Sequence, residues 1–137
     1  MASKLNPYIS FDGKAREALE FYKDVLGGEL NVNTFGEFGN DTGGDADKIM
    51  HGQLETELGF TLMAADNPPG QDHTPGNNFS VSLSGDDDAK LRGYWDKLSD
   101  GGAVMVALEK QMWGDEFGMC ADRFGVTWMV NIAGQQG

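Results

Sequence analysis

The stretch NPYISFDGKAREALEFYKDVL (residues 6–26) decides the fold, because NFSVSLSGDDDAKLRGYWDKL (residues 78–98) repeats it 72 positions later. The identical positions are Asn6/Asn78, Ser10/Ser82, Gly13/Gly85, Leu19/Leu91, Tyr22/Tyr94, Asp24/Asp96 and Leu26/Leu98. A second match at a spacing of 66 adds Gly52/Gly118, Gly59/Gly125, Thr61/Thr127 and Met63/Met129. Solenoid repeats are shorter, about 20–50 residues, so this repeat predicts two similar half-domains.

Hydrophobic periodicity predicts the order strand, helix, strand, strand, strand in each half. In the first half we expect strands at residues 5–11, 29–35, 48–57 and 61–65, with a helix that Asp12 caps and that ends at Leu26. In the second half we expect strands at residues 78–84, 103–108, 117–121 and 126–131, with a helix from Asp86 to a stop at Gly101. Residues 36–47 are rich in Gly and Asp, which predicts a mobile loop.

The length of 137 residues predicts one domain, residues 1–137. Its parts are a first β-α-β-β-β module at residues 5–66, a proline-rich linker at 67–77 and a second module at 78–132. Each half is too small to bury a good core alone. The predicted fold class is therefore α+β, with two tandem β-α-β-β-β modules whose curved mixed sheets surround a cavity.

Charge and cysteine content exclude several classes of partner. The net charge is −12, with 22 acidic and 10 basic residues, and phosphate backbones or anionic membranes need a basic surface. No apolar run reaches the roughly 18–20 residues of a membrane span, and the first residues lack the apolar core of a signal peptide. Cys120 has no partner for an intramolecular disulfide. These features predict a cytoplasmic protein that binds neither nucleic acid nor membrane.

Eight segments carry a resemblance to a known family: NPYISF (6–11), ALEFY (18–22), KIMH (48–51), LMAAD (62–66), PG (69–70), TPGNNFS (74–80), WGDEFGM (113–119) and DRFGVTWM (122–129). In them the chain resembles the PhnB-like branch of the vicinal-oxygen-chelate superfamily. That superfamily includes glyoxalase I, bleomycin-resistance proteins and extradiol dioxygenases. The resemblance implies the tandem fold described above and a homodimer.

The resemblance also implies a divalent metal, with one ligand from the first and one from the last strand of each half. The corresponding positions here are Asn6, Met63, Asn78 and Met129. Two amides and two thioethers are a poor donor set for Zn²⁺, Ni²⁺, Mg²⁺ or Fe²⁺. We therefore predict no metal at these positions and no cofactor, with a displaced metal near His51 and Glu55 as the alternative.

Strand alternation predicts which residues line the cavity. The tentative catalytic pair is His51 and Glu55, which lie about 13 Å apart along one strand face, so that each can pair with Gln53 but not with the other. The predicted ligand-binding residues are Tyr8, Ser10, Gln53, Met63, Ser80, Trp113, Phe117, Met119 and Met129. The first half thus offers polar groups and the second half apolar ones, which suggests a ligand with one polar and one hydrophobic end.

Three functions remain open from the sequence. The first is a small-molecule binder that lacks the usual metal quartet. The second is a glyoxalase-like enzyme in which His51 and Glu55 hold a displaced metal or act as acid and base. The third is an interaction module without a ligand. Two further residues are assigned no role: Cys120 is expected to be buried and inert, and His73 to be exposed.

Overall fold

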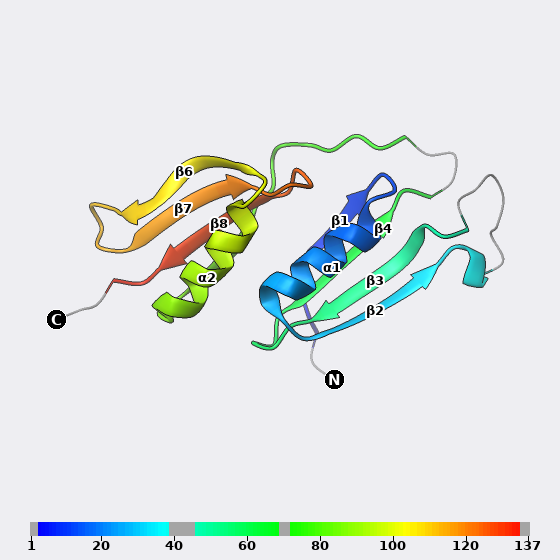
Figure 1. Cartoon of the computed structure of the whole chain (residues 1–137), viewed down its shortest axis with the longest axis horizontal. Helices are drawn as coiled ribbons and strands as arrows, with labels where there is room; N and C mark the ends of the chain where they lie inside the picture. The colour runs from blue at the N-terminus through cyan, green and yellow to red at the C-terminus, as the bar shows by residue number, and fades with distance from the viewer. Residues whose placement is uncertain (1–2, 39–45, 69–71, 135–137) are drawn as a thin grey trace. The chain divides into compact units, whose positions relative to one another are not determined.

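The computed structural model describes residues 3–38, 46–68 and 72–134 and divides the chain into two compact units, Met1–Pro75 and Gly76–Gly137. Each unit contains a four-stranded mixed sheet and one α-helix, which confirms the predicted α+β fold (Figure 1). Most of the predicted mobile loop at 36–47, and residues 69–71 of the predicted linker, lie outside the described residues.

The first unit follows the predicted order of elements. Its elements are β1 (Tyr8–Phe11), α1 (Ala15–Leu26), β2 (Glu29–Thr34), the short 3-10 helix η1 (Gly36–Phe38), β3 (Ile49–Glu55) and β4 (Thr61–Asp66). The sheet order is β1-β4-β3-β2, in which β1 and β4 are parallel and the other pairs are antiparallel. The helix η1 was not predicted. It stands in the described start of the loop, where the backbone N–H of Glu37 donates to Thr34 Oγ1 at 3.2 Å.

The second unit repeats this arrangement. Its elements are β5 (Val81–Gly85), α2 (Asp88–Ser99), β6 (Ala103–Lys110), β7 (Glu116–Ala121) and β8 (Thr127–Ile132). The sheet order is β5-β8-β7-β6, with β5 and β8 parallel. The predicted strand starts at residues 5 and 78 were three residues early. In the first unit the reason is Pro7, which has no N–H to donate to a strand ladder and only accepts from the N–H of Met63.

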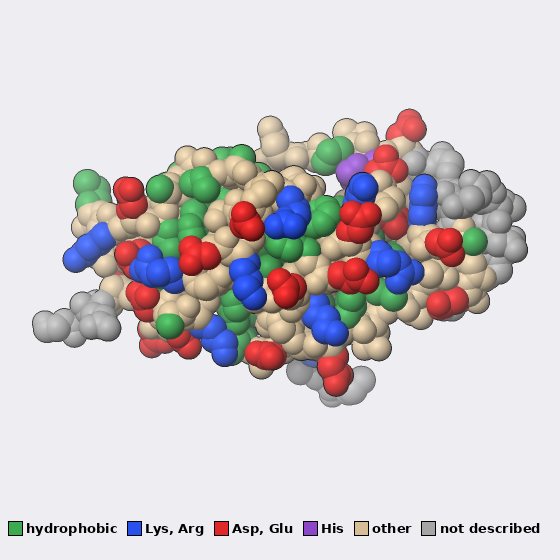
Figure 2. Space-filling model, viewed as in Figure 1, with side chains coloured by type: hydrophobic (Ala, Val, Ile, Leu, Met, Phe, Trp, Pro, Cys, Tyr) green, Lys and Arg blue, Asp and Glu red, His purple; other side chains and the backbone are tan. Residues whose placement is uncertain are grey.

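The packing of the helices explains which residues recur at a spacing of 72. Leu19, Tyr22 and Leu26 of α1 are buried against the sheet of the first unit, and their counterparts Leu91, Tyr94 and Leu98 of α2 are buried in the second. These residues recur at helical spacing, so each helix has one apolar stripe. Figure 2 shows acidic and basic side chains interspersed elsewhere on the visible surface.

The repeated glycines of β3 and β7 mark the places where the helices cross the sheets. A Cβ atom on Gly52 would lie 2.2 Å from Leu19 Cδ1, and one on Gly118 would lie 2.8 Å from the ring of Trp95. A larger residue at either position would force the helix side chain to move. The Gly52/Gly118 match at spacing 66 therefore records helix packing.

The N-terminus of α1 is stabilised from a distant strand. Asp12 does not cap the helix as predicted; the N-cap position is Lys14, whose side chain makes no capping bond. Instead the buried Asp66 at the end of β4 accepts from the backbone N–H of Ala15 at 3.0 Å and from that of Ile49 at 2.9 Å. One carboxylate thus satisfies the helix end and the start of β3, which the local sequence could not reveal.

Asp66→Ala is expected to lower the free energy of unfolding by about 2–3 kcal/mol, because two backbone N–H groups lose their acceptor inside the protein. Urea denaturation followed by circular dichroism measures the loss. The matched control is Asp12→Ala, which removes the exposed residue that sequence reasoning favoured as the cap. That control is expected to change the stability by less than about 0.5 kcal/mol. Equal losses in the two variants would contradict the assignment.

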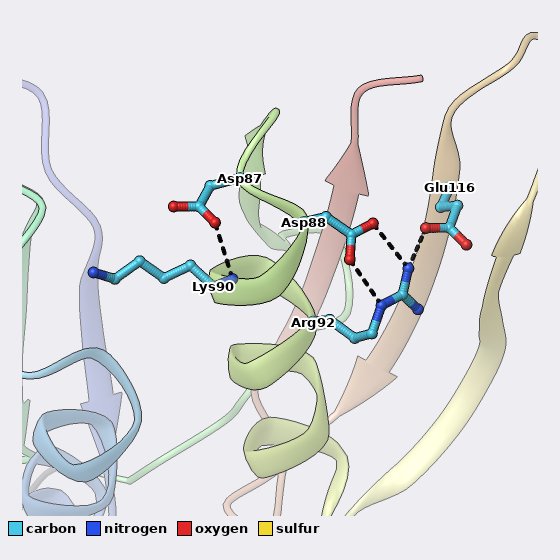
Figure 3. A network of polar contacts seen from close by, with 5 residues as sticks. All are labelled: Asp87, Asp88, Lys90, Arg92 and Glu116. Carbon is cyan, nitrogen blue, oxygen red and sulfur yellow. Dashed lines mark hydrogen bonds and ion pairs between the residues drawn. The ribbon is translucent and has the colours of Figure 1, made fainter. Parts of the chain in front are cut away.

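The start of α2 is capped locally, near where the sequence predicted. Asp87 is the N-cap and accepts from the backbone N–H of Lys90 at 3.2 Å (Figure 3). Arg92, one turn later, donates to Asp88 at 3.2 Å and also to Glu116 of β7, which ties the helix to the sheet (Figure 3). Hydrogen bonds from Arg92 lower the pKa of the Asp88 carboxyl.

No helix within the described parts of the chain has the length and apolar character needed to cross a membrane.

Candidate binding site

The face of the first sheet that points away from α1 gathers most of the predicted polar site residues. The register places Tyr8 of β1 beside Met63 of β4, Met63 beside Gln53 of β3, and Gln53 beside Asn31 of β2. Paired residues share a face of a sheet, and Leu19 of α1 touches Gly52 on the opposite face. This row therefore crosses all four strands on the helix-free side.

A chain of hydrogen bonds runs along this face. The Tyr8 hydroxyl lies 3.1 Å from Nδ1 of His51, and Nε2 of His51 lies 3.4 Å from Oε1 of Gln53. Nε2 of Gln53 donates to Oε1 of Glu55, and the hydroxyl of Thr61 donates to Oε2 of Glu55 at 2.7 Å. As the strand geometry predicted, His51 and Glu55 do not meet, and Gln53 bridges them. Side chains from three strands are thus joined in one polar chain.

The chain carries its charge at one end. Hydrogen bonds from Gln53 and then Thr61 lower the pKa of the Glu55 carboxyl, burial raises it by less, and the positive charge of Lys4 lowers it by the smallest amount. Glu55 is therefore an anion at neutral pH. At the other end the rings of Tyr8 and His51 lie 5.6 Å apart at a tilt of 42°. The hydrogen-bonded chain thus leads from the carboxylate of Glu55 to the phenol of Tyr8.

The helix-free face of the second sheet is less polar. Its corresponding row is Ser82 of β5, Met129 of β8, Met119 of β7 and Val106 of β6. Trp113, in the turn between β6 and β7, is 59% exposed, and its ring lies 6.3 Å from that of Phe117. This face therefore offers thioethers and aromatic rings where the first offers titratable groups. Ser10 belongs to the first face, beside Ala65.

The register also shows a limit of the repeat. The spacing of 72 makes Ser80 the counterpart of Tyr8, yet the residue beside Met129 is Ser82. Ser80 precedes β5 and is exposed. The first strand of the second unit is thus offset by two residues from the sequence repeat, because strand register depends on the packing of the whole sheet.

The positions that correspond to the family's metal ligands lie partly on strands and partly before them. Met63 and Met129 lie on β4 and β8, whereas Asn6 and Asn78 precede β1 and β5. Within residues 3–38, 46–68 and 72–134, no three His, Cys, Asp or Glu side chains lie close enough together to hold a metal ion. Amides and thioethers do not fit the divalent ions that the family uses.

Sequence reasoning missed two polar groups on or near the first face. Asn31 of β2 completes the row beside Gln53, and the alternation of β2 would have revealed it. His73, expected to be exposed, is half-buried, and its Nε2 donates to the backbone carbonyl of Ser10 at 3.0 Å. No pattern in the sequence links His73 to Ser10, which lies 63 positions away.

Cys120 is buried on the helix side of β7. Burial, with a contribution from the charge of Asp122, raises the pKa of its thiol from 9.0 to about 11. At pH 8 the reactive thiolate should be about 100-fold scarcer than in the unfolded chain. We expect native protein to react with 5,5′-dithiobis(2-nitrobenzoate) at least that much more slowly than protein unfolded in guanidinium chloride. Comparable rates would show that the thiol is accessible.

Comparisons with known proteins agree with this fold. A model of the Glyoxalase/Bleomycin resistance protein/Dioxygenase superfamily matches residues 4–130. Protein YjdN of Escherichia coli (strain K12) is 28% identical over 144 residues, which cover 96% of this chain and 97% of that protein. Protein PA1353 of Pseudomonas aeruginosa has a solved structure with a TM-score of 0.87 and 37% identity, covering 98% of this chain and 100% of that one. A PhnB protein structure from Bacillus cereus gives a TM-score of 0.77 at 22% identity, covering 96% and 100%. The predicted resemblance is confirmed.

Proposed function

The chain belongs to the glyoxalase/bleomycin resistance protein/dioxygenase superfamily, and from that premise we propose that it binds a small organic molecule on the helix-free face of its first sheet. The observation that carries this proposal is the hydrogen-bonded chain from Tyr8 through His51 and Gln53 to Glu55. Polar side chains that already hold one another in place lose little entropy when a ligand arrives.

The position of these hydrogen-bonded side chains on the sheet supports a role in ligand recognition. The apolar core lies on the other face of the sheet, where Leu54, Leu62 and Ala64 are buried. Folding therefore does not require a connected polar chain on the helix-free face. A cross-strand polar pair contributes only about 0.2–1 kcal/mol to a sheet. A ligand, by contrast, gains orientation from a few converging polar groups.

We propose that this binding does not use the metal quartet of the family. At the positions concerned the donors are Asn6, Met63, Asn78 and Met129, which divalent ions such as Zn²⁺ and Mg²⁺ bind poorly. The chemistry of the site is therefore assigned to its own side chains.

A second candidate function is acid–base catalysis at the same face. It is favoured by the connection of His51 to Glu55 through Gln53, since a carboxylate that orients an imidazole prepares it for proton transfer. In that case His51 would be required for turnover and less strongly for binding. The two candidates share one site and differ in the readout.

The test is a screen of small hydroxyl, carbonyl and carboxylate compounds by thermal shift, confirmed by ¹⁵N-resolved NMR titration of the whole chain. For compounds that bind, Tyr8→Phe is expected to weaken affinity by about tenfold, the effect of one lost hydrogen bond, and Gln53→Met to weaken it by breaking the polar chain that holds His51 and Tyr8. The matched control is Glu17→Ala on the exposed side of α1, with affinity unchanged. Failure of every compound to bind, or binding that both variants leave intact, would refute the proposal.

A parallel arm adds Ni²⁺, Zn²⁺ or Mn²⁺ to the protein alone. The proposal predicts no stabilisation by these ions, given the donor set described above. Stabilisation that disappears in His51→Ala would replace the metal-free proposal with the displaced-metal alternative. Stabilisation that disappears in Met63→Leu would restore the metal position of the family.

A further inference from the structure

We infer that the phenol oxygen of Tyr8 is the group that meets the ligand, and that His51 stands behind it as a proton acceptor and does not touch the ligand. This inference rests on the proposed function and assigns the roles within that site. It also names the ligand chemistry: a molecule that presents a hydroxyl or another weakly acidic O–H or N–H to Tyr8.

The first step of the argument is the occupancy of His51. An imidazole has two ring nitrogens. Nδ1 faces the Tyr8 hydroxyl at 3.1 Å and Nε2 faces Gln53 Oε1 at 3.4 Å. Both are engaged within the protein, so His51 has no nitrogen left for a ligand. Tyr8 lies on the edge strand β1 and is 52% exposed. The phenol is therefore the accessible end of the chain.

The second step is the position of each proton, which follows from the charged end. Glu55 as an anion accepts hydrogen bonds only, so the side-chain NH₂ of Gln53 must face it. The carbonyl oxygen of Gln53 then faces His51, and Nε2 of His51 must carry the hydrogen. In the neutral imidazole the other nitrogen, Nδ1, is bare and accepts the Tyr8 hydroxyl proton. The carboxylate thus selects the tautomer through Gln53.

The third step is what this tautomer lets Tyr8 do. Its only proton points at His51, so its outward lone pairs can accept a hydrogen bond. When a ligand X–H gives its proton to the Tyr8 oxygen, the original Tyr8 proton moves to Nδ1. The X–H bond breaks, a new O–H bond forms on Tyr8, and the products are X⁻ and a protonated His51. Atoms and charge balance, and the Nε2–H of the imidazolium keeps Gln53 Oε1 as its acceptor.

The register gives this geometry its support. β4 lies between β1 and β3, and beside Ser10 it contributes the small Ala65. The register pairs Tyr8 with Met63 and Met63 with Gln53, so the Tyr8 hydroxyl reaches His51 diagonally across β4. In this scheme Tyr8 meets the ligand, His51 accepts the proton through Tyr8, and Gln53 is a positioning residue.

The first experiment reads the tautomer directly. The ¹⁵N chemical shifts of the His51 ring, taken from a long-range ¹H–¹⁵N spectrum, are expected to show a protonated Nε2 and a bare Nδ1. Gln53→Met should give a mixture of tautomers. Thr61→Val removes the other hydrogen bond to Glu55 and leaves Gln53 in place, so the tautomer should persist. A wild-type spectrum with Nδ1 protonated and Nε2 bare would overturn the inference.

The second experiment reads the phenol. N-acetylimidazole transfers its acetyl group to a tyrosine oxygen: the oxygen–acyl bond forms, the acyl–imidazole bond breaks, the leaving imidazole takes a proton from water, and His51 takes the phenol proton. Tyr8 is expected to be acetylated about tenfold faster in the wild type than in His51→Phe, with Gln53→Met in between. Mass spectrometry locates the label, and the buried Tyr22 and Tyr94 are internal controls. Equal rates in the wild type and His51→Phe would refute the role of His51.

Neither experiment needs the natural ligand. Failure of this inference can therefore be told apart from failure of the proposed function. Compounds that bind Tyr8-dependently, together with an unreactive Tyr8 or the wrong tautomer, would retain the binding site and reject the proton transfer. If His51 shows the predicted tautomer and Tyr8 the predicted reactivity but no compound binds, the proton path from Tyr8 to His51 would stand and its use in small-molecule binding would be rejected.

Discussion

Asp122→Ala is expected to lower the free energy of unfolding by about 3–5 kcal/mol, because it strips the acceptor from three N–H groups at once. Asp122 is 3% exposed in the turn between β7 and β8. Its carboxylate accepts from the backbone N–H groups of Phe124 at 2.8 Å and Val126 at 3.1 Å, and from the indole N–H of Trp128 at 2.9 Å. Trp128 is among the largest fully buried side chains, so its indole cannot turn to water without opening the core.

Urea denaturation followed by tryptophan fluorescence measures this loss. The matched control is Thr56→Val in the equivalent turn of the first unit. There one hydroxyl accepts from the N–H of Phe60 at 2.8 Å, and its loss should cost about 1 kcal/mol. Asp122→Asn keeps one carbonyl acceptor and should fall between the two. A loss below about 1 kcal/mol in Asp122→Ala would show that water replaces the carboxylate.

Gly28→Ala is the second change with a large expected effect, at least about 3 kcal/mol. Gly28 has φ +105°, and a Cβ atom there would lie 1.9 Å from the carbonyl oxygen of Glu55 and 2.7 Å from the Cα of Thr56. Both atoms belong to the backbone at the end of β3, which cannot move aside without breaking its pairing with β2. The variant should also disturb the polar chain that starts at Glu55.

The matched control separates the clash from the backbone conformation. Gly59 has a similar φ of +88°, but nothing lies within 4 Å of a Cβ placed there. Gly59→Ala should therefore cost only the left-handed conformation, about 1–2 kcal/mol. Thermal or urea unfolding of both variants gives the difference. If Gly28→Ala lowered the stability no more than Gly59→Ala, the backbone near Gly28 and Glu55 would have moved apart to relieve the clash.

The predictable part of the fold is the part that short-range periodicity encodes. Leu19 and Leu91 repeat because each helix needs the same apolar stripe, and Gly52 and Gly118 repeat because each helix crosses a strand at the same place. The two turns repeat as well, with Gly59 and Gly125 both in the left-handed region. The helix stripes and the turn glycines depend on neighbours along the chain and could be interpreted without a structure, whereas the reason for the Gly52/Gly118 pair came only from helix packing.

The candidate site was predictable only as a set of residues sharing a face. Alternation along β3 places His51, Gln53 and Glu55 on one side, and the same alternation places Tyr8 with them. Which of their atoms meet was not predictable. The pairing of Tyr8 with His51 spans 43 positions and depends on the strand order, in which β4 separates β1 from β3.

The sequence by itself determined the number and order of the strands and α-helices, the apolar stripes of the helices and the faces of the strands. These properties follow from the periods of the helix and the strand, which act within a few residues. Only the tertiary structure decided that Asp66, and not Asp12, satisfies the start of α1, that Ser82 lies beside Met129, and that the polar chain ends at an exposed Tyr8. Strand register and long-range hydrogen bonds result from the packing of a whole unit, so no local pattern encodes them.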